Sequence, residues 1–254
     1  ADVQKIILDK NLASGVLLSN GVQINSDLVV FAGDPAICHE QLLDRHPPRL
    51  TSLIPGMGKH YSMGLYVLYF GTKKLYPDVA HHTIWMGPRF REHLADIFNR
   101  KHLADDFSLY LHRPTATDKS FAPQNCESFY VLCPVPNLEG QVDWDAMGPQ
   151  LADKIVTALD NTILPELPSV IDQMFWMTPE DFKNDYRSLY GAGFSIAPRL
   201  TQSAYFRYHN RDRSISNLYY AGAGTHPGAG LPGVVSSAKV VEELLTGSEV
   251  GSGG

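Results

Sequence analysis

The sequence is poor in cysteine, has no long apolar run and carries no excess of positive charge. Its three cysteines, Cys38, Cys126 and Cys133, are odd in number and lack CxxC spacing, which argues against a disulfide framework and a cysteine-based zinc site. The formal net charge of −6 argues against a nucleic-acid-binding protein, because such a protein needs a basic face to contact phosphates. No stretch approaches the roughly 18 consecutive apolar residues of a membrane-spanning helix.

The N-terminal residues include neither an initial methionine nor a secretory signal. The chain begins at Ala1 rather than at a methionine, and the residues that follow have neither the basic nor the apolar region of a secretory signal. Together with the low cysteine content, this predicts a reducing, cytoplasmic environment. Because a strand-like pattern starts at once at Val3, we interpret the start as a cut within a longer protein. The Gly- and Ser-rich residues 247–254 predict a flexible tail.

Strand and helix patterns follow one another along the chain, which predicts an α/β fold, or α+β in some schemes. Residues 1–32 have the pattern of β structure. Asn20-Gly21 between two short apolar runs predicts a hairpin, because both residues tolerate a positive φ. The apolar run 28–32 is typical of a strand buried on both faces, and it ends at the turn-forming Gly33-Asp34-Pro35.

The middle of the chain alternates between the two patterns. Apolar and aromatic runs predict three strands, at 65–70, 107–112 and 129–133. The last of these is expected to end at Pro134 and Pro136. Helical spacing predicts helices at 89–98 and 151–163, and the run Thr178-Pro179-Glu180-Asp181 predicts the start of another. The helix at 89–98 would bury its apolar side chains, Phe90, Leu94, Ile97 and Phe98.

The last segment contains a glycine-rich loop between a strand and a helix. A strand is predicted at 217–221, a helix with an apolar side over 234–245, and residues 222–233 between them read GAGTHPGAGLPG. Glycines let a backbone approach a ligand closely, and free N–H groups at a helix N-terminus favour negative charge. The loop matches neither GxxxxGK[ST] nor GxGxxG, since Pro227 stands where the second pattern needs glycine. The pattern alone therefore leaves a cofactor site and a structural turn equally open.

The loop and its surroundings resemble the bacterial-type phytoene desaturases, which are FAD-dependent carotenoid desaturases. Residues 217–245, NLYYAGAGTHPGAGLPGVVSSAKVVEELL, are similar to the C-terminal flavin-contacting motif of that family. Four further runs resemble the family in order and spacing: LYFGTKKLYPDVAHHTIWMGPRFREHLADIF, DDFSLYLHRPTATDKSFAP, FYVLCPVPNL and LTQSAYFRYHNRD. The resemblance extends from about Leu65 to Leu245. Residues 31–35, FAGDP, depart from the Asn-Ala-Asp-Pro that the family commonly has.

The resemblance implies part of a two-domain FAD-binding flavoprotein fold with an inserted substrate domain. It implies flavin-domain strands at 1–35, a substrate- and membrane-facing domain at 36–215, and a flavin-contacting strand, loop and helix at 216–246. In full-length members a GxGxxG fingerprint near the N-terminus binds the ADP half of FAD, and this sequence lacks that fingerprint. The chain by itself is therefore expected not to hold FAD tightly and to be inactive as an enzyme.

By the same resemblance, FAD is the cofactor and the glycine-rich loop contacts it. The backbone of 222–225 would approach the pyrophosphate and ribityl region. The N–H groups near Pro232 would face the pyrimidine end of the flavin, where a helix N-terminus stabilises the negative charge of the reduced form. The implied cofactor-binding residues are Gly222, Ala223, Gly224, Thr225, Gly230, Pro232, Gly233 and Val234.

The implied reaction is the dehydrogenation of phytoene toward lycopene. A hydride would leave an allylic carbon for flavin N5 and a neighbouring proton would be lost, with oxygen or a quinone as electron acceptor. No catalytic residue is identified. A polyene hydrocarbon has no hydrogen-bonding groups, so its recognition requires a long apolar channel. Aromatic residues of the predicted strands are candidate channel walls, with core packing as the stronger alternative: Tyr66, Tyr69, Phe70, Phe129 and Tyr130.

A hydrocarbon substrate dissolves in the bilayer, so the resemblance also implies peripheral association with a membrane surface. The helix predicted at 89–98 combines an apolar side with flanking basic residues, which is compatible with interfacial binding. Ordinary packing of this helix is the stronger alternative. Its flanking basic residues are Arg89, Arg91, Arg100 and Lys101.

Several other residues have two interpretations each. His81 and His82 are expected on opposite faces of a strand, so no metal site is predicted. His226 is the best placed histidine for proton transfer, although fixing the loop geometry is the stronger alternative. Asp34 could orient the cofactor or cap its turn. A basic stretch before the last strand is expected to be solvated rather than to contact cofactor or lipid: Arg207, His209, Arg211 and Arg213.

Three alternative functions stay open. The chain could come from a related carotenoid desaturase, isomerase or ketolase. It could be a non-catalytic fragment that binds carotenoid or membrane without flavin. It could also be a subunit that receives its ADP-binding half from another chain.

Overall fold

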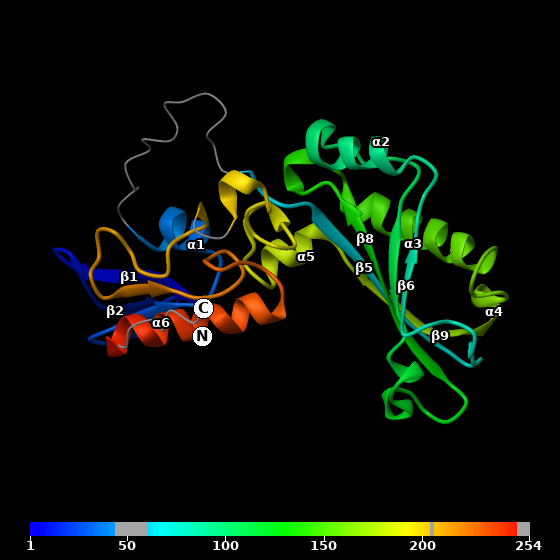
Figure 1. Ribbon diagram of the computed structural model, residues 1–254, viewed down its shortest axis with the longest axis horizontal. Coiled ribbons are helices and arrows are strands. Elements are labelled where there is room, and N and C mark those ends of the chain that lie inside the picture. The colour runs from blue at the N-terminus through cyan, green and yellow to red at the C-terminus, as the bar shows by residue number, and fades with distance from the viewer. Residues whose placement is uncertain (44–59, 204–205, 248–254) are drawn as a thin grey trace, which may run out of the picture. The chain divides into compact units, whose positions relative to one another are not determined.

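The computed structural model describes residues 1–43, 60–203 and 206–247. The chain folds into two compact units (Figure 1). The first unit contains residues 1–62, 186–189 and 194–254, and the second contains residues 63–185 and 190–193. Both units combine helices with strands, which confirms the predicted α/β class.

This division differs from the sequence-based boundaries, which grouped residues 36–215 in one domain. Residues 194–215 instead pack with the first unit. The Gln202 side chain accepts a hydrogen bond from the His60 amide at 2.8 Å and donates one to the His60 carbonyl at 2.9 Å. The functional roles of the segments stay predictions. From position 248 onward, the predicted tail lies outside the described residues.

The first unit begins with a three-stranded antiparallel sheet, formed by β1 (Val3–Asp9), β2 (Leu12–Leu18) and β3 (Gln23–Asn25). The predicted hairpin between β2 and β3 is confirmed. Its loop closes from the Gly21 amide to the Leu18 carbonyl, and Gly21 has a positive φ of 84°. Asn20 does not use its tolerance for positive φ. Its side chain instead accepts a hydrogen bond from the Val22 amide.

A parallel pair of strands follows. β4 (Val29–Phe31) pairs with β10 (Leu218–Tyr220), which confirms the strand predicted at 217–221. The expectation that residues 28–32 are buried on both faces is wrong, since Leu28 and Val30 are 38% and 45% exposed. The reason is that β4 and β10 form a two-stranded sheet within the described residues, so the Val30 side of β4 stays open. After β4 come the short helix α1 (Pro35–Ile37) and a π-helical turn (Cys38–Leu42).

Helix α6 (Leu231–Thr246) confirms the helix predicted after the glycine-rich loop. Most of its predicted apolar side is not buried. Val241 packs with Tyr219 and Ala221, and Ser237 is buried on the same helix. The exposed apolar residues of α6 are Leu231, Val235, Leu244 and Leu245.

The second unit is built on a five-stranded antiparallel sheet with the order β6-β7-β8-β5-β9. The strands are β5 (Gly64–Thr72), β6 (His82–Trp85), β7 (Leu109–His112), β8 (Glu127–Val135) and β9 (Ile171–Met177). β5 confirms the strand predicted at 65–70 and lies between β8 and β9. The strand expected to end at Pro134 and Pro136 continues through Pro134, which pairs with Leu65, and ends at Val135, directly before Pro136. Pairing with β7 stops at Leu132, so the missing N–H of Pro134 interrupts no bond to β7.

Helix α3 (Trp144–Asp160) covers one face of this sheet and confirms the predicted helix. Its Leu151, Ile155 and Leu159 are buried in one core cluster with Leu68 and Val131 of the sheet. Two shorter helices follow, α4 (Leu167–Val170) and α5 (Pro179–Asn184). The predicted start of α5 is confirmed by a complete capping box. Short 3-10 turns lie at Pro114–Ala116, Lys119–Phe121, Leu138–Gly140, Leu189–Gly191 and Leu200–Gln202.

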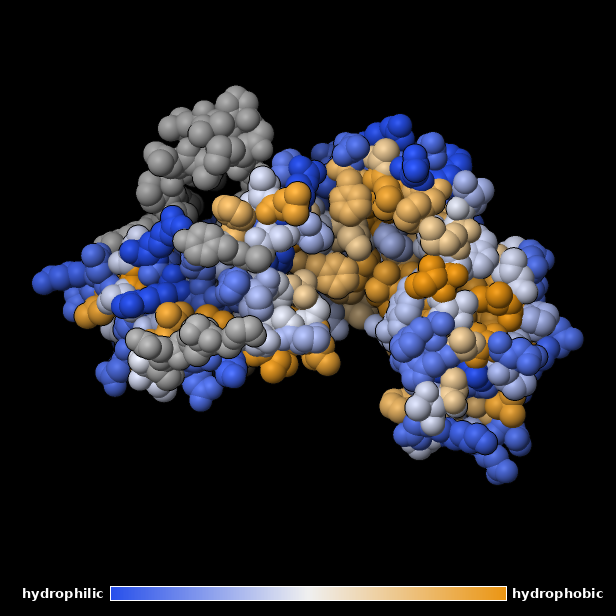
Figure 2. Space-filling model, in the orientation of Figure 1, coloured by the Kyte–Doolittle hydropathy of each residue, from blue (hydrophilic) through white to orange (hydrophobic). Residues whose placement is uncertain are grey.

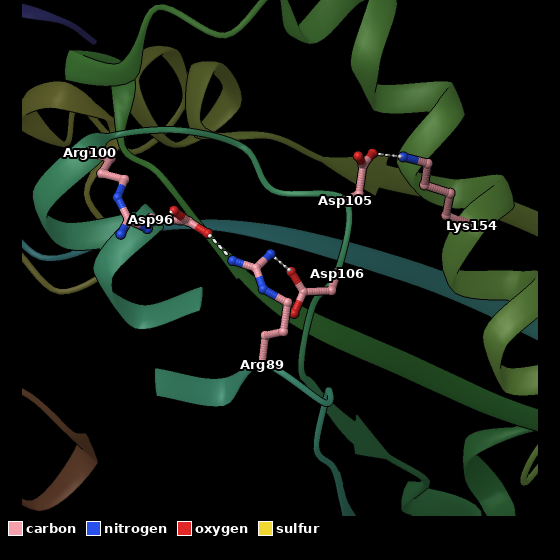
Figure 3. Close-up of polar contacts among 6 residues, drawn as sticks. All are labelled: Arg89, Asp96, Arg100, Asp105, Asp106 and Lys154. Carbon is pink, nitrogen blue, oxygen red and sulfur yellow. Dashed lines mark hydrogen bonds and ion pairs between the residues drawn. The ribbon is translucent and has the colours of Figure 1, made fainter. Parts of the chain in front are cut away.

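Helix α2 (Phe90–Ala95), continued by a π-helical turn (Asp96–Arg100), confirms the predicted helix, and Ile97 is buried as expected, but Phe90 and Leu94 are not. Asp96 is 5% exposed and forms ion pairs with Arg89 and Arg100 (Figure 3). This pairing turns the charged residue inward, so Phe90 and Leu94 are 42% and 37% exposed. Figure 3 also shows Arg89 paired with Asp106, and Lys154 of α3 paired with Asp105.

Two further observations concern the cysteines and the helices of the described residues. The three cysteines are free, and burial raises the pKa of the Cys38 thiol to about 12. Across the part of the chain that the structure describes, none of the helices has the length and apolar character needed to cross a membrane.

We expect Arg113→Met to lower the free energy of unfolding of the second unit by about 3–5 kcal/mol, because it leaves a buried carboxylate without its cation. Arg113 and Glu127 form an ion pair of 2.8 Å, with side chains 9% and 4% exposed. Urea denaturation followed by tryptophan fluorescence measures this unit alone, since the three tryptophans all lie within 63–185. Lys73→Met, which removes an exposed ion pair, is the control, and equal losses in both variants would contradict the prediction.

Candidate functional site

The glycine-rich loop lies at the carboxyl ends of the two parallel strands of the first unit. β4 continues into the FAGDP turn, 31–35, and β10 continues into residues 221–230, which end at the start of α6. The Ala221 amide extends the pairing by donating to the Phe31 carbonyl at 3.0 Å. Adjacent carboxyl ends of parallel strands, followed by a helix N-terminus, are where α/β folds bind nucleotide cofactors.

Two glycines allow the loop and the FAGDP turn to approach each other. Gly222 has a φ of 111°, and a Cβ added there would lie 3.2 Å from the Ala32 carbonyl oxygen. A Cβ on Gly224 would lie 2.5 Å from Pro35 Cδ and 2.9 Å from Ser195 Oγ. The contact between the two turns therefore depends on the missing side chain at Gly224 and on the backbone freedom of Gly222.

A buried arginine holds the beginning of the loop. Arg207 is 4% exposed, and its guanidinium donates to the carbonyl of Ala223 at 2.5 Å and to those of Phe194 and Ile196 at 3.4 Å. The expectation that the basic stretch is solvated is wrong for this residue, because the loop carbonyls replace water around its charge. Burial lowers the pKa of Arg207, and the nearby Asp34 opposes this shift.

A buried asparagine connects the end of β10 to the middle of the loop. The Asn210 side chain donates to the Tyr220 carbonyl at 3.1 Å and to the His226 carbonyl at 2.9 Å. Ser237 of α6 accepts a hydrogen bond from the Gly222 amide at 2.7 Å. The loop is thus fixed by side chains that precede and follow it in the sequence.

The start of α6 forms the open end of the site. Gly230, with a φ of 93°, is the N-cap, and a Cβ on Gly233 would lie 2.6 Å from the Gly228 carbonyl oxygen. The amides of Leu231 and Gly233 belong to the first helical turn, which has no acceptor for them within the helix. Leu231 is 80% exposed. These free N–H groups and the helix dipole fit a negatively charged part of a cofactor.

All eight predicted cofactor-binding residues lie in this loop or in the first turn of α6. They differ in whether their backbone amides are bonded within the protein. The amides of Gly222, Thr225 and Val234 are already bonded inside the protein, to Ser237 Oγ and to the Gly222 and Gly230 carbonyls. Residues 230–232, by contrast, are exposed, and Gly233 is partly exposed. The residues present therefore fit FAD at the open end of the loop, and the contacts of each residue with FAD stay a prediction.

Two neighbouring residues have structural roles. The His226 amide donates to the Tyr208 carbonyl at 3.0 Å, and its own carbonyl accepts from Asn210, so this residue helps to fix the loop. Its role in proton transfer stays a prediction. Asp34 caps α1 by accepting from the Ala36 amide at 3.0 Å.

The candidate channel residues divide between the two faces of the sheet in the second unit. Tyr66, Phe70 and Phe129 are at most 4% exposed and lie in the core, which confirms core packing for these three. Tyr69 and Tyr130 lie half-buried on the other face, with ring centroids 6.0 Å apart. Apolar side chains gather on the visible face of this unit over β5 and β8 (Figure 2).

Cross-strand register extends the Tyr69–Tyr130 pair into a line across the sheet. Tyr69 stacks on Phe175 of β9, with ring centroids 4.8 Å apart and planes inclined by 13°. Phe175 is 60% exposed. We refer to the five residues that lie opposite one another in the register as the aromatic row: His82, His112, Tyr130, Tyr69 and Phe175.

The sequence-based reading missed Phe175, His112 and Asn210. A signal existed for Phe175, because residues 174–177 form an apolar and aromatic run directly before a helix cap. No local signal existed for Asn210, since its partners lie 10 and 16 residues away in an irregular loop.

Known proteins resemble this chain along nearly all of its length. The flavin containing amine oxidoreductase family matches residues 2–241. The lycopene-forming phytoene desaturase of Pseudescherichia vulneris is 46% identical over 246 residues, which are 96% of this chain and 50% of that protein. The neurosporene-forming phytoene desaturase of Cereibacter sphaeroides is 42% identical over 248 residues, 96% of this chain and 48% of that protein. The chain spans about half the length of the curated relatives it matches.

A solved structure shows a similar fold. An oxidoreductase from Methanosarcina mazei aligns with a TM-score of 0.61 at 14% identity, over 95% of this chain and 48% of that one. At this identity the likeness concerns the fold alone, and it agrees with the predicted α/β class.

We expect Asn210→Ala to loosen the glycine-rich loop, because two buried carbonyls lose their donor at a cost of about 1–3 kcal/mol. Hydrogen–deuterium exchange of the loop amides should become faster, while exchange in β1 and β2 stays unchanged. Asn20→Ala, at an exposed turn, is the matched control. Unchanged exchange in residues 221–230 of Asn210→Ala would contradict the clamping role.

Proposed function

The chain belongs to the flavin-containing amine oxidoreductase family, and we propose that it forms part of a FAD-dependent carotenoid desaturase that dehydrogenates phytoene toward lycopene. The observation that carries this proposal is the 46% identity to a lycopene-forming phytoene desaturase over 96% of the chain. Membership of a flavin-containing family confirms the flavin cofactor expected from the sequence.

In this proposal the open end of α6 binds the FAD. The amides of Leu231 and Gly233 donate to its anionic or electron-rich atoms, and the helix dipole adds to their effect. Arg207 and Asn210 keep the loop in place, so these amides are oriented before the cofactor arrives. When bound, the flavin accepts a hydride from an allylic carbon of the substrate, and oxygen or a quinone serves as the electron acceptor.

The polyene substrate lies against the open face of the sheet in the second unit. This substrate has no hydrogen-bonding groups, so its binding free energy comes from the burial of apolar surface. Tyr69, Tyr130 and Phe175 supply a flat, partly exposed aromatic surface for this purpose. Their ring faces also stabilise positive charge that develops on the reacting carbon.

A related desaturase that stops at an earlier product is the second candidate. The 42% identity to a neurosporene-forming desaturase favours it, because the two kinds of relative are almost equally similar to this chain. The number of desaturation steps distinguishes the candidates.

Peripheral membrane association, on the cytoplasmic side, completes the proposal. Phe90 and Leu94 of α2 are exposed, and Arg91 on the same helix is exposed beside them. An exposed apolar pair beside a basic residue suits the interface of an anionic bilayer. The partner of this helix is thus a membrane surface that contains the substrate.

We expect a chimera in which this chain replaces the matching half of the Pseudescherichia vulneris desaturase to retain FAD and to convert phytoene. The chain alone should lose its flavin on gel filtration, because it presents one loop of the flavin site. Flavin absorbance after gel filtration and chromatography of the carotenoid products measure the two properties.

A chimera that retains FAD but leaves phytoene unchanged would overturn the desaturase proposal. Accumulation of neurosporene instead of lycopene would select the second candidate. Stoichiometric FAD on the chain alone would show that the glycine-rich loop is sufficient for binding.

Tyr69→Ala combined with Phe175→Ala in the chimera should raise the KM for phytoene by about tenfold or more. Covering a fully exposed apolar side chain contributes about 1.5–3 kcal/mol, the exposed Phe175 and the half-buried Tyr69 each contribute part of this, and about 1.4 kcal/mol corresponds to a tenfold change. Leu200→Ala removes a 92% exposed apolar side chain of the first unit and should leave the KM unchanged. A KM that responds equally to both changes would refute the role of the aromatic row.

Phe90→Ser combined with Leu94→Ser should reduce co-sedimentation of the chain with anionic phospholipid vesicles, by about tenfold in the binding constant. Circular dichroism should stay unchanged, since both side chains are exposed. Leu12→Ser, at an exposed apolar position in β2, is the control. Equal vesicle binding by the double variant and the control would exclude α2 as the membrane contact.

A further inference from the structure

Three histidines gather at one edge of the second unit. His81 directly precedes β6, His82 is the first residue of β6, and His112 is the last residue of β7. One ring nitrogen from each lies within 4.8 Å of the other two, and the Nε2 atoms of His81 and His112 are 2.7 Å apart. Within the described ranges, this is the single group of three side chains with metal-ligating atoms so close together.

The expectation that His81 and His82 point to opposite faces of a strand is wrong. His81 lies in the bend before β6, and the two ring centroids are 4.3 Å apart. His82 is directly opposite His112 in the register. The neighbouring residues form the backbone hydrogen bond: the Arg113 amide donates to the His81 carbonyl at 2.8 Å. His82 and His112 are therefore a non-hydrogen-bonded pair of the antiparallel ladder. Side chains of such pairs lie closest together.

Two hydroxyl groups orient the rings. His81 Nδ1 forms a hydrogen bond with Thr117 Oγ1, and His82 Nδ1 forms one of 2.7 Å with the Tyr110 hydroxyl. When each Nδ1–H donates to its hydroxyl partner, the lone pair on Nε2 remains available to bind a metal ion. Hydrogen-bond partners outside the metal site orient metal-binding histidines in this way. His112 Nδ1 is buried and has no hydrogen-bond partner in the described structure, and the Nε2 of this ring is the atom that faces His81.

We propose that His81, His82 and His112 form a binding site for a divalent transition-metal ion of the Zn²⁺ type. Three imidazole nitrogens are a donor set that zinc, copper and nickel accept, whereas magnesium and calcium require oxygen ligands. Tetrahedral coordination with bonds of about 2.0–2.1 Å separates the nitrogens by about 3.3 Å. The present spacing, 2.7 Å between the Nε2 atoms of His81 and His112 and at most 4.8 Å among the three ligand atoms, brackets that value.

Three protein ligands leave a fourth coordination position for water or a small anion. His81 and His112 also line a pocket of about 520 Å³ together with Tyr69, Phe121 and Tyr130, so the ion is accessible from this pocket. The ion would also connect the bend before β6 to the end of β7 and so stabilise this edge of the sheet. The metal site does not depend on the proposed desaturase activity.

The test uses the tag-free 254-residue chain after dialysis against a chelator. Isothermal titration with ZnCl₂ should give one site per chain, and added Co²⁺ should give the visible absorption of a tetrahedral complex. His112→Gln should weaken binding by roughly 100-fold, because the loss of an outer partner alone costs 10–100-fold. His82→Gln, at an exposed ring, should weaken binding without affecting the fold.

His102→Gln is the matched control, since His102 is an exposed histidine of the same unit outside the cluster. Zinc should raise the midpoint of thermal unfolding of the wild type and of His102→Gln, but not that of His82→Gln. Zinc affinity that is equal in wild type, His82→Gln and His81→Gln would overturn the proposal, even if His112→Gln fails to fold. Absence of a stoichiometric site in the wild type would overturn it as well.

Discussion

The site in the first unit depends on the parallel pairing of β4 with β10. These strands come from opposite ends of the chain, and Asn217, just before β10, anchors them to the N-terminal sheet. Its side chain accepts a hydrogen bond from the Ala13 amide at 2.7 Å across 204 residues of sequence. The register places Tyr220 opposite Phe31, so the two turns that follow begin at the same level. A slip of one residue would displace them by about 3.3 Å and break the contacts that their glycines permit.

The loop that follows combines rigidity with an open end. Its buried part is held by Arg207 and Asn210, which use side-chain donors to satisfy carbonyls that no regular secondary structure could pair. Its exposed part ends in the first turn of α6, where backbone donors have no partner within the helix. Rigid support and free donors are both needed to orient a cofactor, because a flexible loop would lose conformational entropy on binding.

In the sheet of the second unit, successive side chains of a strand point to opposite faces, so one face packs in the core and the other is open for binding. Along β5, Tyr66, Leu68 and Phe70 point into the core under α3, whereas Tyr69 points to the open face. The core side therefore tolerates little change, while the open side carries the aromatic row and the three histidines. One strand thus contributes both to the stability of the unit and to its candidate binding surface.

The sequence by itself determined the α/β class, the hairpin at Asn20-Gly21, the caps of α5 and the strand, loop and helix of 217–246, because these follow from local backbone preferences and period. The glycine motif and its resemblance also identified the loop that we propose as part of the flavin site. Only the tertiary structure decided which side chains are buried. It turned Asp96 inward on α2, buried Arg207 among carbonyls and brought His81, His82 and His112 together. Such placements depend on partners distant in sequence, whose hydrogen bonds and charges outweigh local hydrophobic pattern.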